Sequence, residues 1–404
     1  MSVKIRIISQ YFSPDTASTG KLLSELATAL ASQNIEVSAI TAFPTYNPSI
    51  KALRKEVVEK VFIQRIWSTR LNKNTMFGKV LNSASFFFSV LIRLLFSSSS
   101  APLFIVTTPP FLSLVGVILR KLRKIPYIFL VYDVYPDIAV KLNYLSPNSF
   151  IVWFWNKLNK WVLHSASHIV VISEEMKNCI LQKKITNENI NISIIHNWTD
   201  GNVIKPISYS DNKFIRENNL DGKFIIQYSG NIGLFYKLET IIESAHLTPN
   251  FDILFMFIGE GGKKQKLQEL VQSYNLSNVK FFPYQEWSML SHSLSAANIS
   301  IVTLDNNISG LTMPSKIYSL MAAGTPIIAL CDSTSDVAKI ITESQCGFVV
   351  EQDNAQELSQ KIQEMKNNQG LLKTMGNNAR KYFEQHFTLE KAATQYETII
   401  CSIQ

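Results

Sequence analysis

The sequence has few of the residues that mark disulfide frameworks or membrane spans. Its 404 residues include only 4 cysteines, which are scattered and are expected to be reduced thiols in a cytoplasmic protein. No apolar run reaches the length of a transmembrane helix. The run that comes nearest, Ser85–Phe96, is broken by Arg93. The first apolar run, Val3–Ile8, alternates with charged residues and predicts a strand instead of a signal peptide.

Several catalytic motifs are also missing. There is no Asp-x-Asp triplet to hold Mg²⁺ or Mn²⁺, and no HExxH or paired CxxC motif to hold zinc. The sequence has no GxSxG nucleophile elbow, no GxxxxGK[ST] loop and no complete GxGxxG fingerprint. We therefore predict no metal site and no cofactor.

Length and charge predict two domains with different surroundings. The chain is 46% hydrophobic and 17% charged, as in globular proteins, and 404 residues exceed one ordinary core. Residues 1–200 carry 22 Lys and Arg against 11 Asp and Glu, whereas the remainder carries 17 against 20. The basic half implies an anionic partner, which could be a membrane surface, a nucleic acid or a phosphorylated substrate.

Apolar runs of strand length alternate with helical patterns in both halves, which favours parallel sheets. Gly20–Ser32 reads as the first helix, the polar stretch Asp200–Asp221 as a linker, and Asn377–Ser402 as a final helical region long enough to return to the first domain. The expected strands are Val3–Ser9, Val37–Thr41, Val61–Trp67, Leu103–Thr107, Tyr127–Tyr132, His168–Ser173, Ser193–His196, Phe224–Ser229, Ile253–Ile258, Val279–Phe282, Ile299–Leu304, Ile327–Cys331 and Gly347–Val350.

Ligands of such sheets bind beyond the carboxyl ends of the strands. Three loops there contain glycine before a helix: Tyr11–Gly20, Ser229–Gly233 and Gly259–Gly262. Lys237 and Glu239 follow the second of them. Two glycine-rich turns in one half indicate phosphate or nucleotide binding, although each alone is also compatible with an ordinary turn.

The segment Asn306–Cys331 predicts a loop, a helix, a tight turn and a buried strand. Pro314 suits a first helical turn, Gly324 suits the position after the helix, and Lys316 falls in the first turn. A cation beside the positive end of the helix dipole favours a bound anion between them, with a solvated surface lysine as the alternative.

The motifs together resemble a known family, glycosyltransferase family 4, nearly from end to end. The segments that carry the resemblance are YFSPDTASTGKLLSELATALASQNIEVSAITAFPTY, HNWTDGNVIKP, YSGNIG, FIGEGG, VKFFPY, AANISIVTL, PSKIYSLMAAGTPIIA and NARKYFEQHFTLEKAATQYE. VYDVYP, SGNIG and PSK resemble the branch with fucosamine-transferase-like enzymes of surface-polysaccharide assembly.

The resemblance implies an α/β protein of the GT-B fold, in which two Rossmann-like domains face a central cleft. The implied domains are residues 1–200 for the acceptor and residues 201–385 for the nucleotide sugar, with residues 386–404 as a helix that packs back on the first domain.

The sequence departs from the family at two pairs of positions. The glutamates that the family usually places before its AMA.G.P segment fall on Leu311 and Ser319, so a carboxylate cannot hold the ribose there. The family's phosphate-binding Arg and Lys fall on Asn231 and Tyr236. Neutralisation of a diphosphate must then come from Lys316, with Lys237 and backbone N–H groups, which decides the two readings of Lys316 in favour of function.

Site residues follow from the same resemblance. Lys316 and Asp133 are implied as catalytic, since Asp133 occupies the place where the family often has its catalytic histidine or aspartate; a helix cap or turn residue is the alternative for Asp133. On the acceptor side the implied residues are Ser18, Thr19, Gly20 and Tyr46. On the donor side they are Gly230, Asn231, Lys237, Gly259, Glu260, Gly261, Phe282, Pro283, Tyr284, Thr312, Pro314, Ser315 and Ser319.

The implied activity is retaining, metal-independent transfer of a hexosyl or N-acetylhexosaminyl group from a UDP-sugar to a glycan, without nucleic acid. A nucleotide-sugar epimerase or hydrolase of the same fold is an alternative, and a non-catalytic nucleotide-sugar-binding protein is another.

A membrane role is expected for the first domain. Met76–Phe96 places Phe77, Val80, Leu81, Phe87, Val90, Leu91, Leu94 and Leu95 on one helical stripe flanked by Lys79 and Arg93, and Arg120, Lys121, Arg123 and Lys124 form a second basic cluster. Such surfaces suit the inner face of an anionic membrane and a lipid-linked acceptor, although most of these apolar residues could simply form core.

Overall fold

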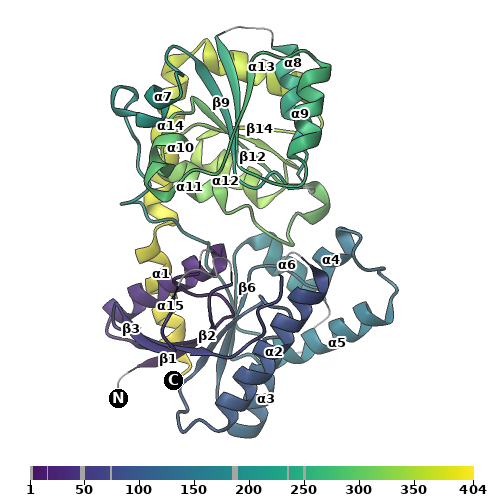
Figure 1. Cartoon of the computed structure of the whole chain (residues 1–404), viewed down its shortest axis with the longest axis vertical. Helices are drawn as coiled ribbons and strands as arrows, with labels where there is room; N and C mark the ends of the chain where they lie inside the picture. The colour runs from purple at the N-terminus through teal and green to yellow at the C-terminus, as the bar shows by residue number, and fades with distance from the viewer. Residues whose placement is uncertain are drawn as a thin grey trace. The chain divides into compact units, whose positions relative to one another are not determined.

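The chain forms two compact α/β units (Figure 1). Unit 1 comprises Met1–Asn197 and Leu389–Gln404, and unit 2 comprises Trp198–Thr388. The computed structural model describes residues 3–15, 17–45, 51–72, 75–183, 190–233, 236–248 and 252–404.

Unit 1 is built on a sheet in the order β3-β4-β2-β1-β5-β6-β7-β8, where β3 pairs antiparallel with β4 and the other pairs are parallel. Its strands are β1 (Lys4–Ile8), β2 (Glu36–Ala42), β3 (Lys55–Val58), β4 (Val61–Ile66), β5 (Leu103–Val106), β6 (Tyr127–Val131), β7 (His168–Val171) and β8 (Ile192–Ile194). Its helices are α1 (Ser18–Ser32), α2 (Met76–Leu95), α3 (Leu114–Arg123), α4 (Asp137–Lys141), α5 (Phe150–Ser165), α6 (Glu174–Gln182) and α15 (Leu389–Ser402).

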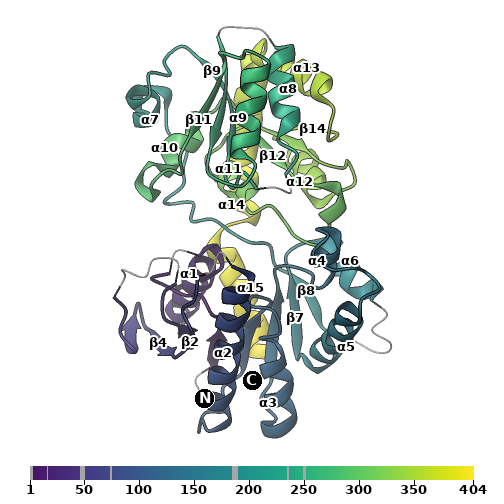
Figure 2. The same ribbon diagram turned by 45° about the vertical axis from the view of Figure 1, so that its right-hand side comes forward.

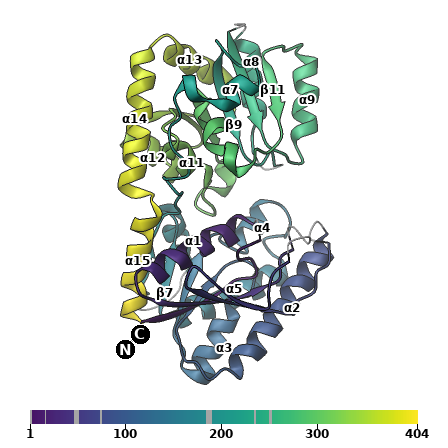
Figure 3. The same ribbon diagram turned by 60° about the vertical axis from the view of Figure 1, so that its left-hand side comes forward.

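The helices of unit 1 cover both faces of its sheet. Helix α2 lies beside α3, and α3 beside α5, on one face, while α1 and α15 pack together on the other (Figures 2 and 3). Tyr396 of α15 is buried, and its ring meets that of Phe104 on β5 edge to face, with centroids 5.4 Å apart. The last helix therefore belongs to the core of unit 1.

Helix α2 differs from what the apolar runs alone predicted. It spans 20 residues and is long and apolar enough to cross a membrane by length and composition, although Lys79 and Arg93 interrupt it. Phe86, Val90 and Leu94 on one side of α2 are buried in unit 1, while its other side stays exposed.

Unit 2 is built on a fully parallel six-stranded sheet in the order β11-β10-β9-β12-β13-β14. Its strands are β9 (Phe224–Ser229), β10 (Ile253–Ile258), β11 (Val279–Phe282), β12 (Ile299–Thr303), β13 (Ile327–Leu330) and β14 (Gly347–Val350). Its helices are α7 (Lys213–Glu217), α8 (Glu239–Leu247), α9 (Lys264–Ser273), α10 (Leu290–Ser295), α11 (Lys316–Ala322), α12 (Asp336–Ser344), α13 (Ala355–Lys366) and α14 (Gln369–His386).

Alternate residues of the central strands of unit 2 fill two cores, because successive side chains of a strand point to opposite faces. Phe255 and Phe257 of β10 join one cluster, and Leu254, Met256 and Ile258 join the other. The predicted linker contributes to the second cluster, since Phe214 and Ile215 of α7 are buried there. Residues 200–221 are thus partly packed into unit 2, and the chain leaves unit 1 after Asn197.

Candidate functional site

The carboxyl edge of the sheet in unit 2 has a topological switch point. Strand β9 pairs with β10 on one side and with β12 on the other. From β9 the strands β10 and β11 follow towards one edge of the sheet, whereas β12, β13 and β14 follow towards the other edge. A crevice at such a point is the usual ligand site of open parallel sheets. The loop after β9 begins at Gly230, and the segment after β12 leads into α11 at Lys316.

The two predicted glycine-rich turns lie against each other there. A Cβ atom built on Gly259 would lie 1.9 Å from the carbonyl oxygen of Gly230, and one built on Gly261 would lie 2.1 Å from that of Ile232. Gly230 and Gly259 have φ values of +139° and +144°, which side chains disfavour. The turn after β9 and the turn after β10 are therefore joined through backbone contacts that only glycine permits.

Hydrogen bonds fix the same pair of turns. The Gly230 N–H donates to Ile258 O at 2.9 Å, and the Ile232 N–H donates to Glu260 O at 2.9 Å. The Tyr228 hydroxyl donates to Asn231 O at 2.8 Å. Because these contacts use backbone atoms of both turns, they set the shape of the turns before any ligand binds.

Lys316 lies beside these turns, at the first position of α11. Its Nζ is 3.2 Å from where a Cβ of Gly230 would be, 3.7 Å from the centre of the Tyr228 ring and 5.1 Å from that of Tyr236. The side chain as a whole is half-buried, but its ammonium nitrogen is fully buried and makes no hydrogen bond to any described residue. Burial lowers the pKa of Lys316 to about 7.

This environment suits the binding of an anion by Lys316. Two aromatic faces stabilise a cation only partly, and a buried cation normally has a carboxylate or several hydrogen-bond acceptors. A phosphate oxygen bound beside Gly230 would supply the missing acceptor and would favour the charged form of Lys316.

The structure places the predicted donor residues at several separate points of unit 2. Gly230, Asn231, Gly259, Gly261, Tyr284 and Lys316 meet around the two turns; the hydroxyl of Tyr284 donates to Glu260 O at 3.4 Å. The side chain of Glu260 pairs with Lys264 at 2.6 Å. Phe282 instead packs on Phe214 in the second core, with ring centroids 5.5 Å apart.

Most of the other predicted donor-side residues lie around the start of α11. Ser315 is the residue before α11 and Pro314 accepts from the Ile317 N–H, while Thr312 lies in the preceding loop. Ser319 lies one turn into the helix, where its hydroxyl is 2.9 Å from that of Thr199. Pro283 follows β11 directly.

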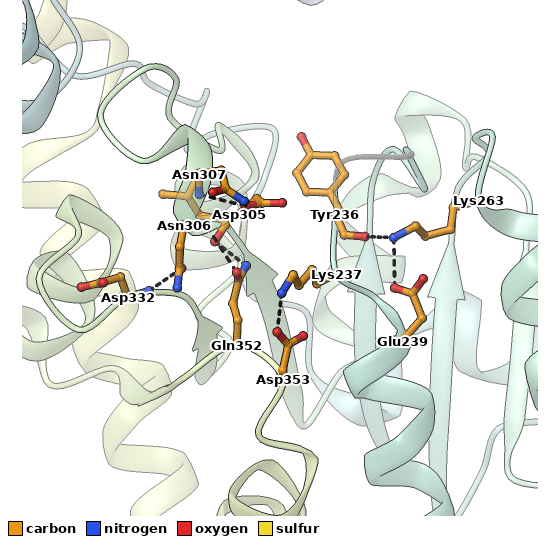
Figure 4. A network of polar contacts seen from close by, with 11 residues as sticks. Tyr236, Lys237, Glu239, Lys263, Asp305, Asn306, Asn307, Asp332, Gln352 and Asp353 are labelled. Carbon is orange, nitrogen blue, oxygen red and sulfur yellow. Dashed lines mark hydrogen bonds and ion pairs between the residues drawn. The ribbon is translucent and has the colours of Figure 1, made fainter. Parts of the chain in front are cut away.

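Lys237 does not approach Lys316 in the described contacts. Its ammonium pairs with Asp353, which follows β14, and this hydrogen bond raises the pKa of Lys237 (Figure 4). A neighbouring network joins Asn306 to Gln352, whose side chain also donates to Leu304 O at 2.6 Å. A role for Lys237 in binding a donor therefore stays a prediction.

Unit 1 has a pocket of its own at the carboxyl end of β6. Asp133 lines it, half-buried, and the rings of Tyr135 and Phe111 flank the ring of Trp155, with centroids 5.5 and 4.4 Å away. Burial and then the charge of Asp133 raise the pKa of Tyr135 to about 12. Asn159 donates to Tyr135 O at 2.5 Å, and Lys183 at the rim pairs with Asp137.

The loop after β1 supplies the other predicted acceptor-side residues. Ser18 and Thr19 open α1, and a Cβ on Gly20 would lie 3.1 Å from backbone atoms of Tyr11 and Phe12, so the loop packs tightly on the helix start. Tyr46 lies outside the described residues.

Sequence reasoning predicted Tyr284 on the donor side but missed other aromatic residues of the two sites. Tyr228 is the last residue but one of β9, a strand that reads as simple core, and Tyr236 entered only as a departure from the family. Trp155 belongs to a helix that was not singled out, FIVWFWNKLNKWVLHS, whose density of tryptophan was the available signal.

Comparison with known proteins identifies both halves of the chain. Residues 19–202 match the family model described as Glycosyltransferase Family 4, and residues 210–382 match that described as Glycosyl transferases group 1. The colanic acid biosynthesis glycosyl transferase WcaI of Escherichia coli, a putative assignment, is 25% identical over 411 residues, 98% of each chain. The probable glycosyltransferase WbjE of Pseudomonas aeruginosa is 28% identical over 242 residues, and the match spans 60% of each chain.

The fold comparison agrees with the sequence matches. The crystal structure of Anabaena HepE in complex with UDP and glucose superposes with a TM-score of 0.72 at 14% identity, covering 99% of this chain and 100% of that one. The predicted GT-B architecture is thereby confirmed. The chain belongs to the glycosyltransferases, with a family 4 domain followed by a group 1 domain.

Proposed function

We propose that the protein transfers a hexosyl or N-acetylhexosaminyl group from a nucleoside-diphosphate donor, a UDP-sugar, to a glycan acceptor in surface-polysaccharide or glycolipid synthesis. One observation carries this proposal: the buried ammonium of Lys316 lies against the Gly230 turn, at the switch point of unit 2, with no described hydrogen-bond partner. A diphosphate would supply both the negative charge and the hydrogen-bond acceptors that the ammonium of Lys316 lacks.

The chemistry follows from where charge develops. Cleavage of the bond between the anomeric carbon and the donor's phosphate oxygen leaves negative charge on that oxygen. Lys316 would stabilise this charge, together with backbone N–H groups at helix starts. The N–H groups of Gly230, Ile232 and Gly259 already donate within the protein. The acceptor hydroxyl forms the new bond on the same face of the sugar and gives its proton to the departing phosphate oxygen, so that configuration is retained and no metal is required.

Unit 1 would bind the acceptor. Asp133 lines a pocket whose aromatic walls suit the apolar face of a sugar ring, and its carboxylate could orient an acceptor hydroxyl or stabilise positive charge on the donor sugar. Two similar proteins support the rest of the proposal: HepE was crystallised with UDP, and WcaI is assigned to colanic acid biosynthesis.

The exposed surface of unit 1 supports the proposal that the protein binds to the inner face of a membrane and transfers sugar to a lipid-linked acceptor there. Large apolar side chains are exposed on α2, and aromatic ones on α5 beside Lys157 and Lys160. Tryptophan and lysine together suit a membrane–water interface. The exposed residues are Met76, Phe77, Val80, Leu81, Phe88 and Ile92 on α2, and Phe150, Ile151, Trp153, Phe154 and Trp161 on α5.

Substitution of Lys316 by alanine tests the proposed role. We expect Lys316→Ala to lower the transfer rate on the order of 10²-fold or more, the usual cost of losing a charged transition-state stabiliser. Lys373→Ala is the matched control, because Lys373 is an exposed lysine on α14 of the same unit. Transfer of labelled sugar from UDP-sugars to a glycan acceptor is the measurement, and a near-normal rate in Lys316→Ala would refute the role.

Incubation with the donor alone separates the alternative activities. A transferase should leave most of the UDP-sugar intact, whereas a hydrolase would release free sugar and an epimerase would convert the sugar while it is still linked to UDP. Binding of the donor with no turnover, even with acceptor present, would indicate a non-catalytic protein.

A further inference from the structure

A group of cations lies in unit 1 outside the pocket that Asp133 lines. Arg6 is the middle residue of β1, Arg93 is in the last turn of α2, and Arg123 ends α3. Arg6 and Arg93 line one cavity with Ser38, Gln64 and Ser97.

Arg6 has an unusual environment for a half-buried arginine. Its Nε donates to the Ser38 hydroxyl at 3.4 Å and its Nη1 to the Ser97 hydroxyl at 3.3 Å, while Nη2 donates to no described residue. Burial, and then the charges of Arg93 and Arg123, lower the pKa of Arg6. In the described part of the chain, none of the three arginines forms an ion pair with a carboxylate.

Another arginine of the same sheet shows the contrast. Arg65 is fully buried, and its guanidinium pairs with Glu56 at 2.5 Å and donates to the carbonyls of Leu53 and Ser13 at 2.7 Å each. The charge of Arg65 is thus paired with a carboxylate inside the protein, as buried cations require, although its Nε makes no hydrogen bond to a described residue. Among the described residues Arg6 has only two hydroxyl acceptors, so the charge at its cavity is left for an external anion.

The helix dipole accounts for only part of this cluster. Arg93 lies at the negative end of α2, and Arg123 donates to Leu94 O at 2.6 Å, which are ordinary roles for cations at a helix C-terminus. Arg6 comes from a strand and gains no such bond in the described contacts.

The cavity continues into an open groove with both basic and apolar walls. Arg93 and Gln64 line both parts, and the lining of the groove adds Arg54 and Lys55 as well as Trp67 and Ile92. Trp67 and Ile92 are 67% and 58% exposed, and Phe96 at the end of α2 is 84% exposed. An anion that binds here therefore meets hydrocarbon surface beside the guanidinium groups.

We propose that this groove, lined by Arg6, Arg93, Gln64, Trp67 and Ile92, binds the phosphate of an anionic phospholipid and seats its chains against α2. The guanidinium fork matches phosphate oxygens in pairs, and the exposed apolar side chains explain why a lipid suits the groove better than a free phosphate. The proposal rests on the membrane association proposed above and specifies one lipid site for it.

Vesicle binding by the full chain tests the site. The wild type should float with phosphatidylglycerol vesicles and not with phosphatidylcholine vesicles, and glycerol 3-phosphate should compete poorly. Arg93→Gln should weaken binding to phosphatidylglycerol about fivefold, the effect expected for removing one cation near the surface. Arg6→Lys should also weaken binding, because an ammonium group cannot pair with two phosphate oxygens as a guanidinium does. Arg6→Lys keeps the charge and loses the fork, so it separates a built site from general attraction.

Lys373→Gln is the charge control, because it removes one exposed cation from unit 2. The proposal is overturned if the wild type ignores phosphatidylglycerol, if Arg93→Gln and Arg6→Lys both bind like the wild type, or if Arg93→Gln loses no more than Lys373→Gln. Effective competition by glycerol 3-phosphate would replace the lipid with a free phosphate and also overturn it. Transfer to a water-soluble acceptor without vesicles should be unchanged in all variants, so loss of the proposed enzymatic function would be seen separately.

Discussion

The surroundings of Lys316 favour the neutral form of its side chain. Two tyrosine rings and the Gly230 turn surround its ammonium nitrogen, and burial brings its pKa to about 7. A bound diphosphate would raise that pKa again, because an adjacent negative charge favours the protonated form. Donor binding should therefore be coupled to the uptake of a proton by this residue.

The coupling predicts how UDP affinity depends on pH. Below pH 7 the free protein already carries the proton on Lys316, so affinity should change little through this group. Above pH 7 the free side chain loses its proton and binding must restore it, so the dissociation constant for UDP should rise by up to about tenfold per pH unit. Isothermal titration calorimetry between pH 6.5 and pH 9, in buffers of different ionisation enthalpy, would measure both the affinity and the proton uptake.

Lys316→Met provides the control for that experiment, since it keeps the length of the side chain and removes the titrating group. Its UDP affinity should be weak and nearly constant from pH 7 to pH 9. A wild-type profile as flat as that of Lys316→Met would show that Lys316 does not take up the proton.

The residue scale also shows where sequence reasoning stops. Lys316 could be predicted because its place depends only on a helix start after a strand. Its contact with Tyr228 and Tyr236 depends on the path of the loop after β9, which no local pattern specifies. The pair between Lys237 and Asp353 joins residues 116 positions apart, and only the packing of β14 into the sheet brings them together.

The elements that shape the donor side are the two glycine turns. Gly259 and Gly222 both have positive φ values, +144° and +73°, but their surroundings differ. A Cβ on Gly259 would meet the Gly230 carbonyl at 1.9 Å, whereas one on Gly222 would meet nothing within 4 Å. The two glycines therefore differ both in backbone conformation, since a φ of +144° is accessible essentially only to glycine, and in the close contact.

We predict that Gly222→Ala costs about 1 kcal/mol, the penalty of a left-handed residue. Gly259→Ala should cost clearly more, because backbone atoms cannot move aside, and it should also abolish UDP binding by separating the two turns. Thermal unfolding and UDP titration of both variants are the measurements. Equal unfolding midpoints for the two variants would show that the turns are not locked together.

Element prediction succeeded where a strand is apolar throughout and failed where it is not. Strands such as β6 and β10 are buried along their whole length and could be found as apolar runs. Strand β3, with the sequence KEVV, is mostly exposed and depends on its pairing with β4 through a turn at Glu59 and Lys60, both with positive φ. Helix α7 was hidden for a similar reason, because two buried residues in a polar stretch make too short a pattern.

For the whole molecule, transfer without a metal is the prediction most easily checked. In the ranges that the structure describes, no group of three His, Cys, Asp or Glu side chains could hold an ion. Because Lys316 is proposed to neutralise the charge that develops on the phosphate, transfer should proceed at the same rate in excess EDTA as in its absence. Loss of activity with the chelator, and recovery with Mg²⁺ or Mn²⁺, would instead require a metal bound with the donor.

The course of the chain has a consequence for synthesis on the ribosome. Unit 2 is one continuous segment, Trp198–Thr388, and can fold as soon as it has emerged. Unit 1 must wait for α15, since buried Tyr396 packs on Phe104 and Gln404 donates to Lys4 O at 2.9 Å. Unit 1 is thus synthesised first but finishes folding last. Until α15 has been synthesised, Phe104 on β5 lacks its packing contact with Tyr396.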